Sequence, residues 1–360
     1  EVSKDFDISL LSSIGITNQR ETTLAWRKST GEHLHNAIVW QDTRTQDICD
    51  EIQTFNELKD EFDKTGLPIA TYFSLSKIIW LIRNVDEVKQ ALREDDLCFG
   101  TIDSWLLFKL TGKHQTDITN ASRTLLFDLH NLEWNKIILE QFDIPEHTLP
   151  KIKPSLSTFA KESSLFGTVP ITAVLGDQQA SLFGHKGFNQ GSVKNTYGTG
   201  CFMLCNTGDK LVASSNGLLT TVAYQIENQS PVFALEGSVA FAGASVQWLR
   251  DNLGLIKKSS DVEKLALEVK DNGDVYFVPA FSGLFAPYWR SDARGVIVGL
   301  TRAATKAHLA RAALEAICYQ TRDVMDAMVA DSGVPMSEMR VDGGITANSL
   351  CMQMQADIMG

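Results

Sequence analysis

The alternation of apolar and polar positions divides the chain into short strands and amphipathic helices. An apolar run of strand length over residues 171–175 leads into Gly176-Asp177. The Thr-Tyr-Gly-Thr-Gly stretch at 196–200 precedes a second apolar run over 201–205. An aspartate at the end of a strand can accept a proton or hold a metal ion, and glycines let backbone N–H groups approach phosphate oxygens. Together these stretches indicate a site that positions a hydroxyl against a phosphate.

Both features also have ordinary structural explanations. An aspartate just before a helix, predicted here over residues 179–184, is most often an N-cap residue. A Gly-Thr-Gly sequence between two strands is most often a tight hairpin turn. This region therefore leaves a catalytic and a purely structural interpretation open.

The chain begins with two predicted strands that are separated by a polar cluster. Apolar residues favour strands over 12–17 and 22–27, which we expect to be neighbours. Between them lies Asn-Gln-Arg-Glu at 18–21, and four large side chains without glycine or proline are unusual in a turn. This composition indicates side chains that face a ligand, although an exposed ion pair between Arg20 and Glu21 would also explain it.

Helical spacing of apolar residues predicts further elements. Residues 74–84 place leucine and isoleucine at helical intervals, and Ser74 could cap this helix. Residues 151–170 lack periodicity, so we expect a surface connection there. Other predicted helices cover 42–60, 135–142, 238–253, 260–270, 306–330 and 348–358. Other predicted strands cover 37–40, 217–225, 232–235, 275–280, 295–300 and 339–342.

Strands followed by helices recur in both halves of the chain. This order predicts an α/β protein with two related domains, divided into residues 1–185 and 186–360. Ligands in such folds bind where strand ends and domain edges meet, so we expect a cleft between the domains to hold the site.

Composition and charge limit the kinds of molecule that the protein could bind and the compartment that it suits. The 360 residues are 44% hydrophobic and 21% charged, and the net charge of −11 argues against nucleic acid as a main partner. No apolar run has the length of a transmembrane helix, and the first residues do not form a signal peptide. The six cysteines are scattered in apolar runs, which favours buried free thiols in a reducing compartment over a zinc site. We therefore expect a cytoplasmic protein.

Several longer motifs occur along the chain in a characteristic order. They are 17–21 (TNQRE), 39–42 (VWQD), 72–74 (YFS) with Lys77 and Trp80, 99–105 (FGTIDSW), 119–124 (TNASRT), 175–178 (LGDQ), 195–202 (NTYGTGCF), 286–289 (APYW) and 341–344 (VDGG). Together these motifs resemble the glycerol kinases, within the FGGY family of carbohydrate kinases that shares the actin and Hsp70 ATPase fold. The resemblance covers essentially the whole chain, and the combination is much more specific than any one motif.

The resemblance implies a polyol site and names its residues. Four side chains would hold the glycerol hydroxyls: Arg20, Glu21, Tyr72 and Asp177. Glycerol offers three hydroxyls that both donate and accept, so a site with fixed carboxylate acceptors and fixed donors suits it. Asp177 would also be the general base and a metal ligand, with Gln178 beside it. Trp40 and Phe202 would pack against the carbon skeleton, although Trp40 could equally be part of the core.

The resemblance also implies ATP as phosphoryl donor and Mg²⁺ as its metal ion. Thr199 and Gly200 would contact the phosphates of ATP, while Gly243 and Gln247 would line the nucleotide site. Gly344 and Asn348 would lie near the adenosine. A structural alternative for Gly243 is that a glycine permits close helix packing.

The expected activity is phosphorylation of glycerol to sn-glycerol 3-phosphate by a homo-oligomer, a dimer or tetramer. Two alternatives remain: a kinase for another small polyol or sugar, and a catalytically silent relative that binds nucleotide. The family's first phosphate loop, Asp-x-Gly-Thr-Thr, and the last part of its C-terminal domain have no counterpart in the sequence. We therefore expect an interior part of a longer protein.

Overall fold

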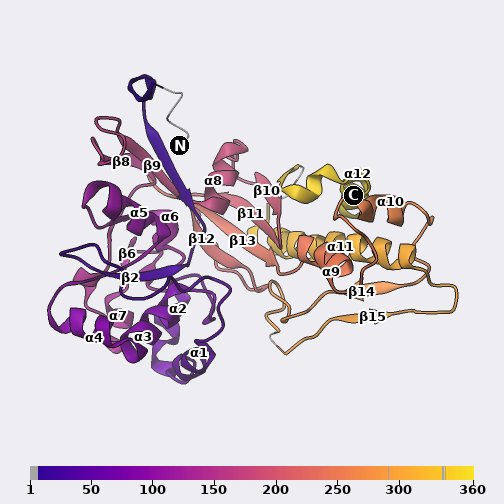
Figure 1. Cartoon of the computed structure of the whole chain (residues 1–360), viewed down its shortest axis with the longest axis horizontal. Helices are drawn as coiled ribbons and strands as arrows, with labels where there is room; N and C mark the ends of the chain where they lie inside the picture. Colours follow the sequence, from indigo (N-terminus) through magenta and orange to yellow (C-terminus); the bar gives the residue numbers. More distant parts are fainter. Residues whose placement is uncertain (1–6, 291, 335, 337) are drawn as a thin grey trace. The chain divides into compact units, whose positions relative to one another are not determined.

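The computed structural model describes residues 7–290, 292–334, 336 and 338–360. The chain forms two compact units (Figure 1). The first contains the chain up to Phe183 together with residues 209–211 and 220–233, and the second contains residues 184–208, 212–219 and 234–360. Within the described residues, no helix combines the length and apolar character needed to cross a membrane.

The first unit contains a three-stranded sheet in which the two strands that carry the candidate site are neighbours. Strand β1 (Ile14–Asn18) pairs in parallel with β9 (Ile171–Gly176), and β8 (Leu156–Ala160) pairs antiparallel on the other side of β9. Asn18 lies opposite Gly176 in this register. The carboxyl ends of β1 and β9 therefore meet at one edge of the sheet, as the paired arrows in Figure 1 show.

Smaller sheets and short helices complete the first unit. The remaining pairs are β2 (Thr23–Arg27) with β3 (Leu97–Thr101), β4 (Gln115–Asp117) with β7 (Lys151–Lys153), and β5 (Phe127–Asp128) with β6 (Glu133–Trp134). The α-helices are α1 (Gln46–Ile52), α2 (Lys59–Asp63), α3 (Ser74–Asn84), α4 (Asp86–Arg93), α5 (Ile102–Thr111), α6 (Ile118–Ala121), α7 (Lys136–Gln141) and α8 (Asp177–Gly184). Helix α3 has the predicted bounds because its apolar positions form one buried face.

Four expectations for the first unit are wrong. The first two strands exist but are not neighbours, because each pairs with a strand distant in sequence. The proposed strand over 37–40 reduces to a single bridge at Ile38. Residues 151–170 contain β7 and β8 instead of an irregular connection. Ser74 does not cap α3, because its hydroxyl donates instead to the carbonyl of Glu21.

The second unit is built on a sheet whose strand order is β13-β11-β10-β16. These strands are β13 (Val232–Val239), β11 (Cys201–Gly208), β10 (Val193–Tyr197) and β16 (Met339–Asp342). The predicted tight hairpin is present, because β10 and β11 are antiparallel and residues 198–200 form their turn. Strand β16 runs parallel to β10, and the boundary between the units passes through β12 (Leu219–Tyr224) and β13.

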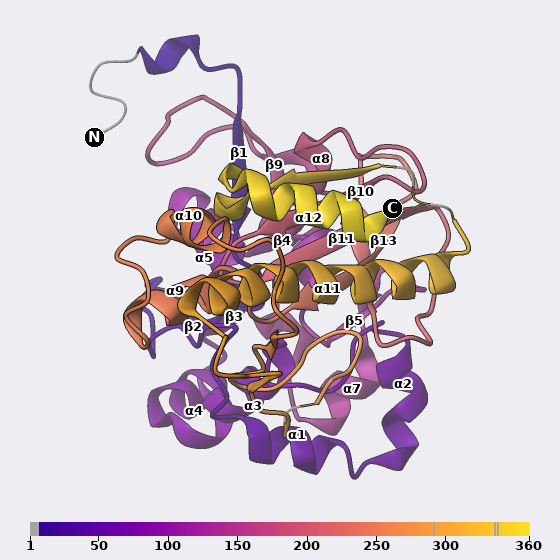
Figure 2. The ribbon, with the colours of Figure 1, turned by 90° about the vertical axis from the view of Figure 1, so that its right-hand side faces the viewer.

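Four α-helices and a small ribbon complete the described part of the second unit. The helices are α9 (Gly243–Asp251), α10 (Asp261–Ala266), α11 (Lys306–Ser332) and α12 (Ser349–Met359), and the ribbon pairs β14 (Tyr276–Val278) with β15 (Val296–Val298). The long helix α11 runs beside α12 (Figure 2). The buried face of α11 is rich in alanine. Helix α9 starts later than the predicted residue 238, because residues 238–239 still belong to β13. All six cysteines are buried and free, as predicted.

A buried carboxylic acid in the first unit has an altered pKa. Asp103 is completely buried and accepts hydrogen bonds from the hydroxyls of Thr101 (2.5 Å) and Thr116 (2.7 Å). Burial raises the pKa of Asp103 from its ordinary value of 3.8 to about 6, and the nearby Asp117 carboxylate adds to this effect. The folded protein therefore holds a proton on Asp103 that the unfolded chain releases above pH 3.8.

We expect the stability contributed by this proton to be present below pH 3.8 and to be lost as the pH rises through about 6. Asp103→Asn keeps the side-chain size and cannot titrate. The free energy of unfolding of the wild type should therefore fall, relative to the variant, across this pH window. Urea unfolding of both proteins at several pH values measures the difference, and a pH-independent difference would contradict the assignment.

Candidate functional site

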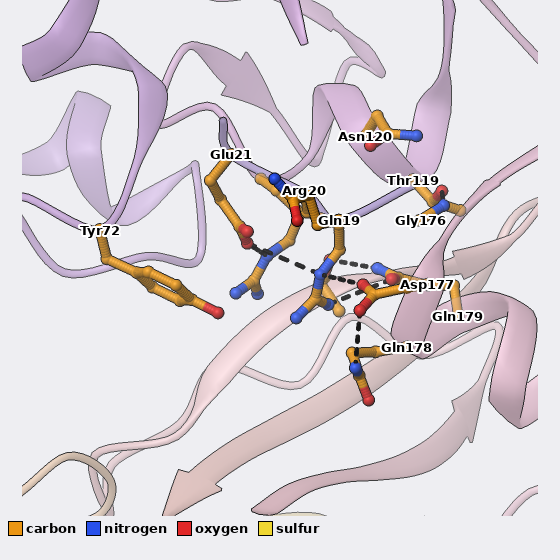
Figure 3. A network of polar contacts seen from close by, with 12 residues as sticks. Gln19, Arg20, Glu21, Tyr72, Thr119, Asn120, Gly176, Asp177, Gln178 and Gln179 are labelled. Atoms are coloured by element: carbon orange, nitrogen blue, oxygen red, sulfur yellow. Dashed lines mark hydrogen bonds and ion pairs between the residues drawn. The ribbon is translucent and has the colours of Figure 1, made fainter. Parts of the chain in front are cut away.

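The meeting of β1 and β9 places three charged residues together. The Arg20 Nε atom lies 3.4 Å from Asp177 Oδ1 and 3.7 Å from Glu21 Oε1 (Figure 3). The side chains of Arg20 and Glu21 are each only 2% exposed, whereas that of Asp177 is 43% exposed. A surface ion pair between Arg20 and Glu21 is thereby excluded. Asp177 is the accessible carboxylate of the group, and its Oδ2 accepts a hydrogen bond from Gln178 Nε2 (2.9 Å).

The backbone of Glu21 has an unusual conformation that aims its side chain. Glu21 has φ of 62°, and the N–H of Thr22 donates to the carbonyl of Arg20 (2.7 Å) across it. Such a three-residue turn with positive φ costs about 1–3 kcal/mol for a residue other than glycine. The hydroxyls of Thr23 (2.9 Å) and Ser74 (3.1 Å) donate to the Glu21 carbonyl and help to hold the turn.

Tyr72 is fixed by its backbone and by neighbouring rings. The ammonium of buried Lys77 donates to the carbonyls of Thr71 (2.6 Å), Tyr72 (2.8 Å) and Phe73 (3.0 Å). Burial lowers the pKa of Lys77 to about 8. The half-buried Trp40 meets the Tyr72 ring edge-on, with centroids 5.4 Å apart. Figure 3 shows the phenol of Tyr72 pointing toward the charged group.

A buried aspartate connects the ends of the two strands. Asp117 caps α6 by accepting hydrogen bonds from the N–H groups of Thr119 and Asn120 (both 2.9 Å). The Thr119 hydroxyl in turn accepts a hydrogen bond from the N–H of Gly176 (2.9 Å), and Asn120 exchanges side-chain hydrogen bonds with Asn18. Asp117 therefore holds β1 and β9 together at the level of the charged group.

The second unit contains a pocket of about 350 Å³. Its lining includes residues from the β10–β11 turn, α9, α10 and the segment that follows β16. Five of the six predicted nucleotide-site residues line it: Thr199, Gly243, Gln247, Gly344 and Asn348. The sixth, Gly200, is buried, and a Cβ there would lie 2.4 Å from the carbonyl oxygen of Val239. Gly200 thus allows the turn to pack closely on β13.

The glycines of this pocket serve different purposes. A Cβ added to Gly344 would meet no atom within 4 Å, so its backbone is open to a ligand. Gly243 instead supports close packing, because its N–H donates to the carbonyl of Gly198 (3.0 Å) and an added Cβ would lie 2.6 Å from that oxygen. Gly243 therefore lets the start of α9 pack closely on the β10–β11 turn, and it also lines the pocket.

The sequence-predicted residues thus separate into two groups. Arg20, Glu21, Trp40, Tyr72, Asp177 and Gln178 belong to the first unit, whereas Phe202 is a half-buried residue of β11 in the second. Sequence reasoning gave no role to Arg123, Lys77 or Asp117. Arg123 and Lys77 lie within the motifs quoted above. Arg123 is the one basic residue in an otherwise uncharged stretch, and this is the signal that could have identified it.

Comparison with known families gives both units the same assignment. Residues 2–184 match the N-terminal domain of the FGGY family of carbohydrate kinases, and residues 193–360 match its C-terminal domain. This chain belongs to the FGGY family of carbohydrate kinases. The expected enzyme class and two-domain α/β fold of these kinases are therefore confirmed.

Individual relatives narrow the comparison within the family. The chain is 54% identical over 357 residues to a glycerol kinase of Clavibacter michiganensis subsp. michiganensis and 56% identical over 360 residues to one of Mycolicibacterium gilvum. Each alignment covers 97% of this chain and 71% of the relative.

Solved structures give the same picture of the family. The crystal structure of Plasmodium falciparum glycerol kinase with ADP has a TM-score of 0.89 and 43% identity, and the alignment covers 97% of this chain and 70% of that one. A gluconate kinase from Lactobacillus acidophilus, with a TM-score of 0.82 at 23% identity, shares the fold; its alignment covers 97% of this chain and 70% of that one.

The contact between β9 and Arg20 gives a test of the site's packing. A Cβ at Gly176 would lie 2.7 Å from both Cγ and Cδ of Arg20, which is too buried to move away freely. We expect Gly176→Ala to lower the free energy of unfolding by about 1–3 kcal/mol, because the added methyl overpacks the site.

Gly184→Ala is the matched control, because an added Cβ at this end of α8 meets no atom within 4 Å. It should leave the stability unchanged or raise it slightly. Denaturant unfolding of both variants measures the effect. Equal stabilities for the two variants would contradict the packing described for Gly176.

Proposed function

We propose that this kinase transfers the γ-phosphoryl group of ATP to glycerol and forms sn-glycerol 3-phosphate. The observation that carries the proposal is the joining of Arg20, Glu21 and Asp177 at the ends of β1 and β9 in a chain 54–56% identical to glycerol kinases. Buried charged groups beside one accessible carboxylate suit a small molecule with several hydroxyls.

In this proposal Asp177 is the general base and takes the proton of the attacking hydroxyl. Its exposure leaves the carboxylate accessible to a substrate, while the contacts with Arg20 and Gln178 orient it. Arg20, Glu21 and Tyr72 hold the remaining hydroxyls, with Gln178 nearby, and Trp40 packs against the carbon atoms. The contact of Phe202 with the acceptor stays a prediction. Positioning of this kind supplies most of the catalysis in phosphoryl transfer.

We assign the pocket of the second unit to ATP. Thr199 and Gly200 would contact its phosphates, and Gly243, Gln247, Gly344 and Asn348 would line the remainder. The open space beside Gly344 and the exposed turn at Gly198 and Thr199 fit backbone contact with a nucleotide. A P. falciparum relative with this fold was crystallised with ADP.

The chain also fits Mg²⁺, which binds proteins through one or two carboxylates and takes its other ligands from phosphates and water. Asp177 is the accessible carboxylate that would contribute to this ion. Within the described residues there is no cluster of three or more His, Cys, Asp or Glu side chains that could hold a metal without a substrate. When bound, Mg²⁺ would offset negative charge on the phosphates.

Three further parts of the proposal extend beyond the reaction. We propose that the domains are residues 1–185, which hold glycerol, and 186–360, which hold ATP. A homo-oligomer, dimer or tetramer, stays a prediction. A cytoplasmic location is supported by six buried free thiols, which suit a reducing compartment.

Turnover with several acceptors separates glycerol from other substrates. Trp40 and Tyr72 are bulky and in contact, which favours a small acceptor. We expect turnover of glycerol to exceed that of dihydroxyacetone and pentoses. Binding of ATP and glycerol without ADP release, measured by calorimetry beside the assay, would instead identify a catalytically silent relative.

We expect Asp177→Asn to keep the polyol KM within about tenfold and to lower kcat by about 10²-fold or more, because the amide keeps the shape but cannot accept the proton. Steady-state kinetics with Mg²⁺-ATP tests this. Near-normal kcat would remove Asp177 from the role of general base.

We expect Gly344→Val to raise the KM for ATP by about tenfold or more, because the three added carbon atoms of the valine side chain would occupy the nucleotide pocket. The melting temperature and the glycerol KM should stay close to wild type, since an added Cβ meets no protein atom within 4 Å. An unchanged ATP KM would show that the nucleotide does not approach Gly344.

A further inference from the structure

Arg123 has no assigned role, yet it contacts two of the side chains that we propose hold the polyol. It follows α6, is completely buried, and donates from Nε to Glu21 Oε1 over 2.7 Å. The Arg123 guanidinium also lies over the Tyr72 ring, 5.8 Å from its centroid, and 5.5 Å from the centroid of Phe73. One buried cation therefore connects an acceptor and a donor of the proposed site.

The charge of Glu21 explains why a cation is needed there. A carboxylate that is 2% exposed stays ionised only when positive charge and hydrogen bonds replace water. The Arg20 Nε lies farther from Glu21 Oε1, at 3.7 Å, and also faces Asp177. Of these two Nε contacts, that of Arg123 is the shorter, and it gives the Glu21 carboxylate a charged hydrogen-bond donor.

The geometry of Arg123 matters as well as its charge. The backbone of Glu21 is in a strained turn, so the direction of its carboxylate depends on the contacts of its side chain. A planar guanidinium can donate to a carboxylate while it lies over an aromatic ring, which a lysine ammonium cannot do in the same way. The arrangement therefore specifies arginine.

We propose that Arg123 is a positioning residue of the polyol site. It orients the Glu21 carboxylate and the Tyr72 phenol toward the acceptor hydroxyls without touching the acceptor itself. The inference rests on the proposed function, since it assigns Glu21 and Tyr72 to the polyol.

The test compares the KM values of the two substrates in the full-length protein. We expect Arg123→Lys to raise the polyol KM by about tenfold or more, the loss expected when a charged hydrogen bond is misplaced, and to change the ATP KM by less than about twofold. Arg311→Lys is the control, because Arg311 forms a largely buried ion pair with Glu315 on α11. It should change neither KM.

A double-mutant cycle shows whether Arg123 acts through Glu21. Glu21→Gln alone should raise the polyol KM, and adding Arg123→Lys should raise it further by less than about threefold. Independent, multiplying effects of the two substitutions would overturn the proposal, as would an equal rise in the ATP KM. If Arg123→Lys does not fold, the double variant Glu21→Gln/Arg123→Met is used instead, because both charges are removed together. Its polyol KM should again exceed that of Glu21→Gln by less than about threefold.

The acceptor assay distinguishes this inference from the proposed function. The wild type is first tested on glycerol, dihydroxyacetone and pentoses. Turnover of another acceptor but not of glycerol would overturn the proposed substrate alone. The KM values of Arg123→Lys and the wild type are then compared for whichever acceptor the wild type phosphorylates. That comparison still decides whether Arg123 positions the polyol site.

Discussion

The parallel pairing of β1 with β9 is the constraint on which the charged group of Arg20, Glu21 and Asp177 depends. In this register Asn18 lies opposite Gly176, so the residues that follow β1 meet the first residue of α8. Parallel strands present their carboxyl ends at the same edge, and side chains leaving that edge converge. A shift of one residue would turn every side chain of β1 to the opposite face of the sheet and would separate Arg20 from Asp177.

Buried polar residues next to this edge of the sheet hold the charged group in place. Asp117 links the strand ends through Thr119 and Asn120, and Lys77 fixes the backbone around Tyr72. Buried polar networks stabilise one arrangement only when nearly every member finds a partner, because an unsatisfied group is costly. The positive φ of Glu21 is maintained by the same surroundings. Such rigidity would suit the proposed binding of a small, flexible acceptor.

The pocket of the second unit uses backbone more than charge. Its lining combines the β10–β11 turn with the residues after β16. Gly344 leaves the main chain open to a ligand, whereas Gly200 lets the turn pack closely on β13. Phosphate groups can be bound by backbone N–H groups without a charged side chain, and this suits a chain with a net charge of −11. The charged group and the pocket thus lie in two different compact units of the chain.

The sequence by itself determined the elements with strong local patterns. Helix α3 has the predicted bounds, and α11 and the strand before Asp177 were recognised because apolar periodicity is a local property. Motifs likewise identified the family and five of the residues that line the pocket. Tertiary structure alone decided that β1 and β2 are not neighbours, that β7 and β8 are strands, and that Arg123 contacts Glu21 across 102 positions of sequence. Strand pairing and buried charge contacts depend on partners far apart in the chain, and no local pattern of residues specifies them.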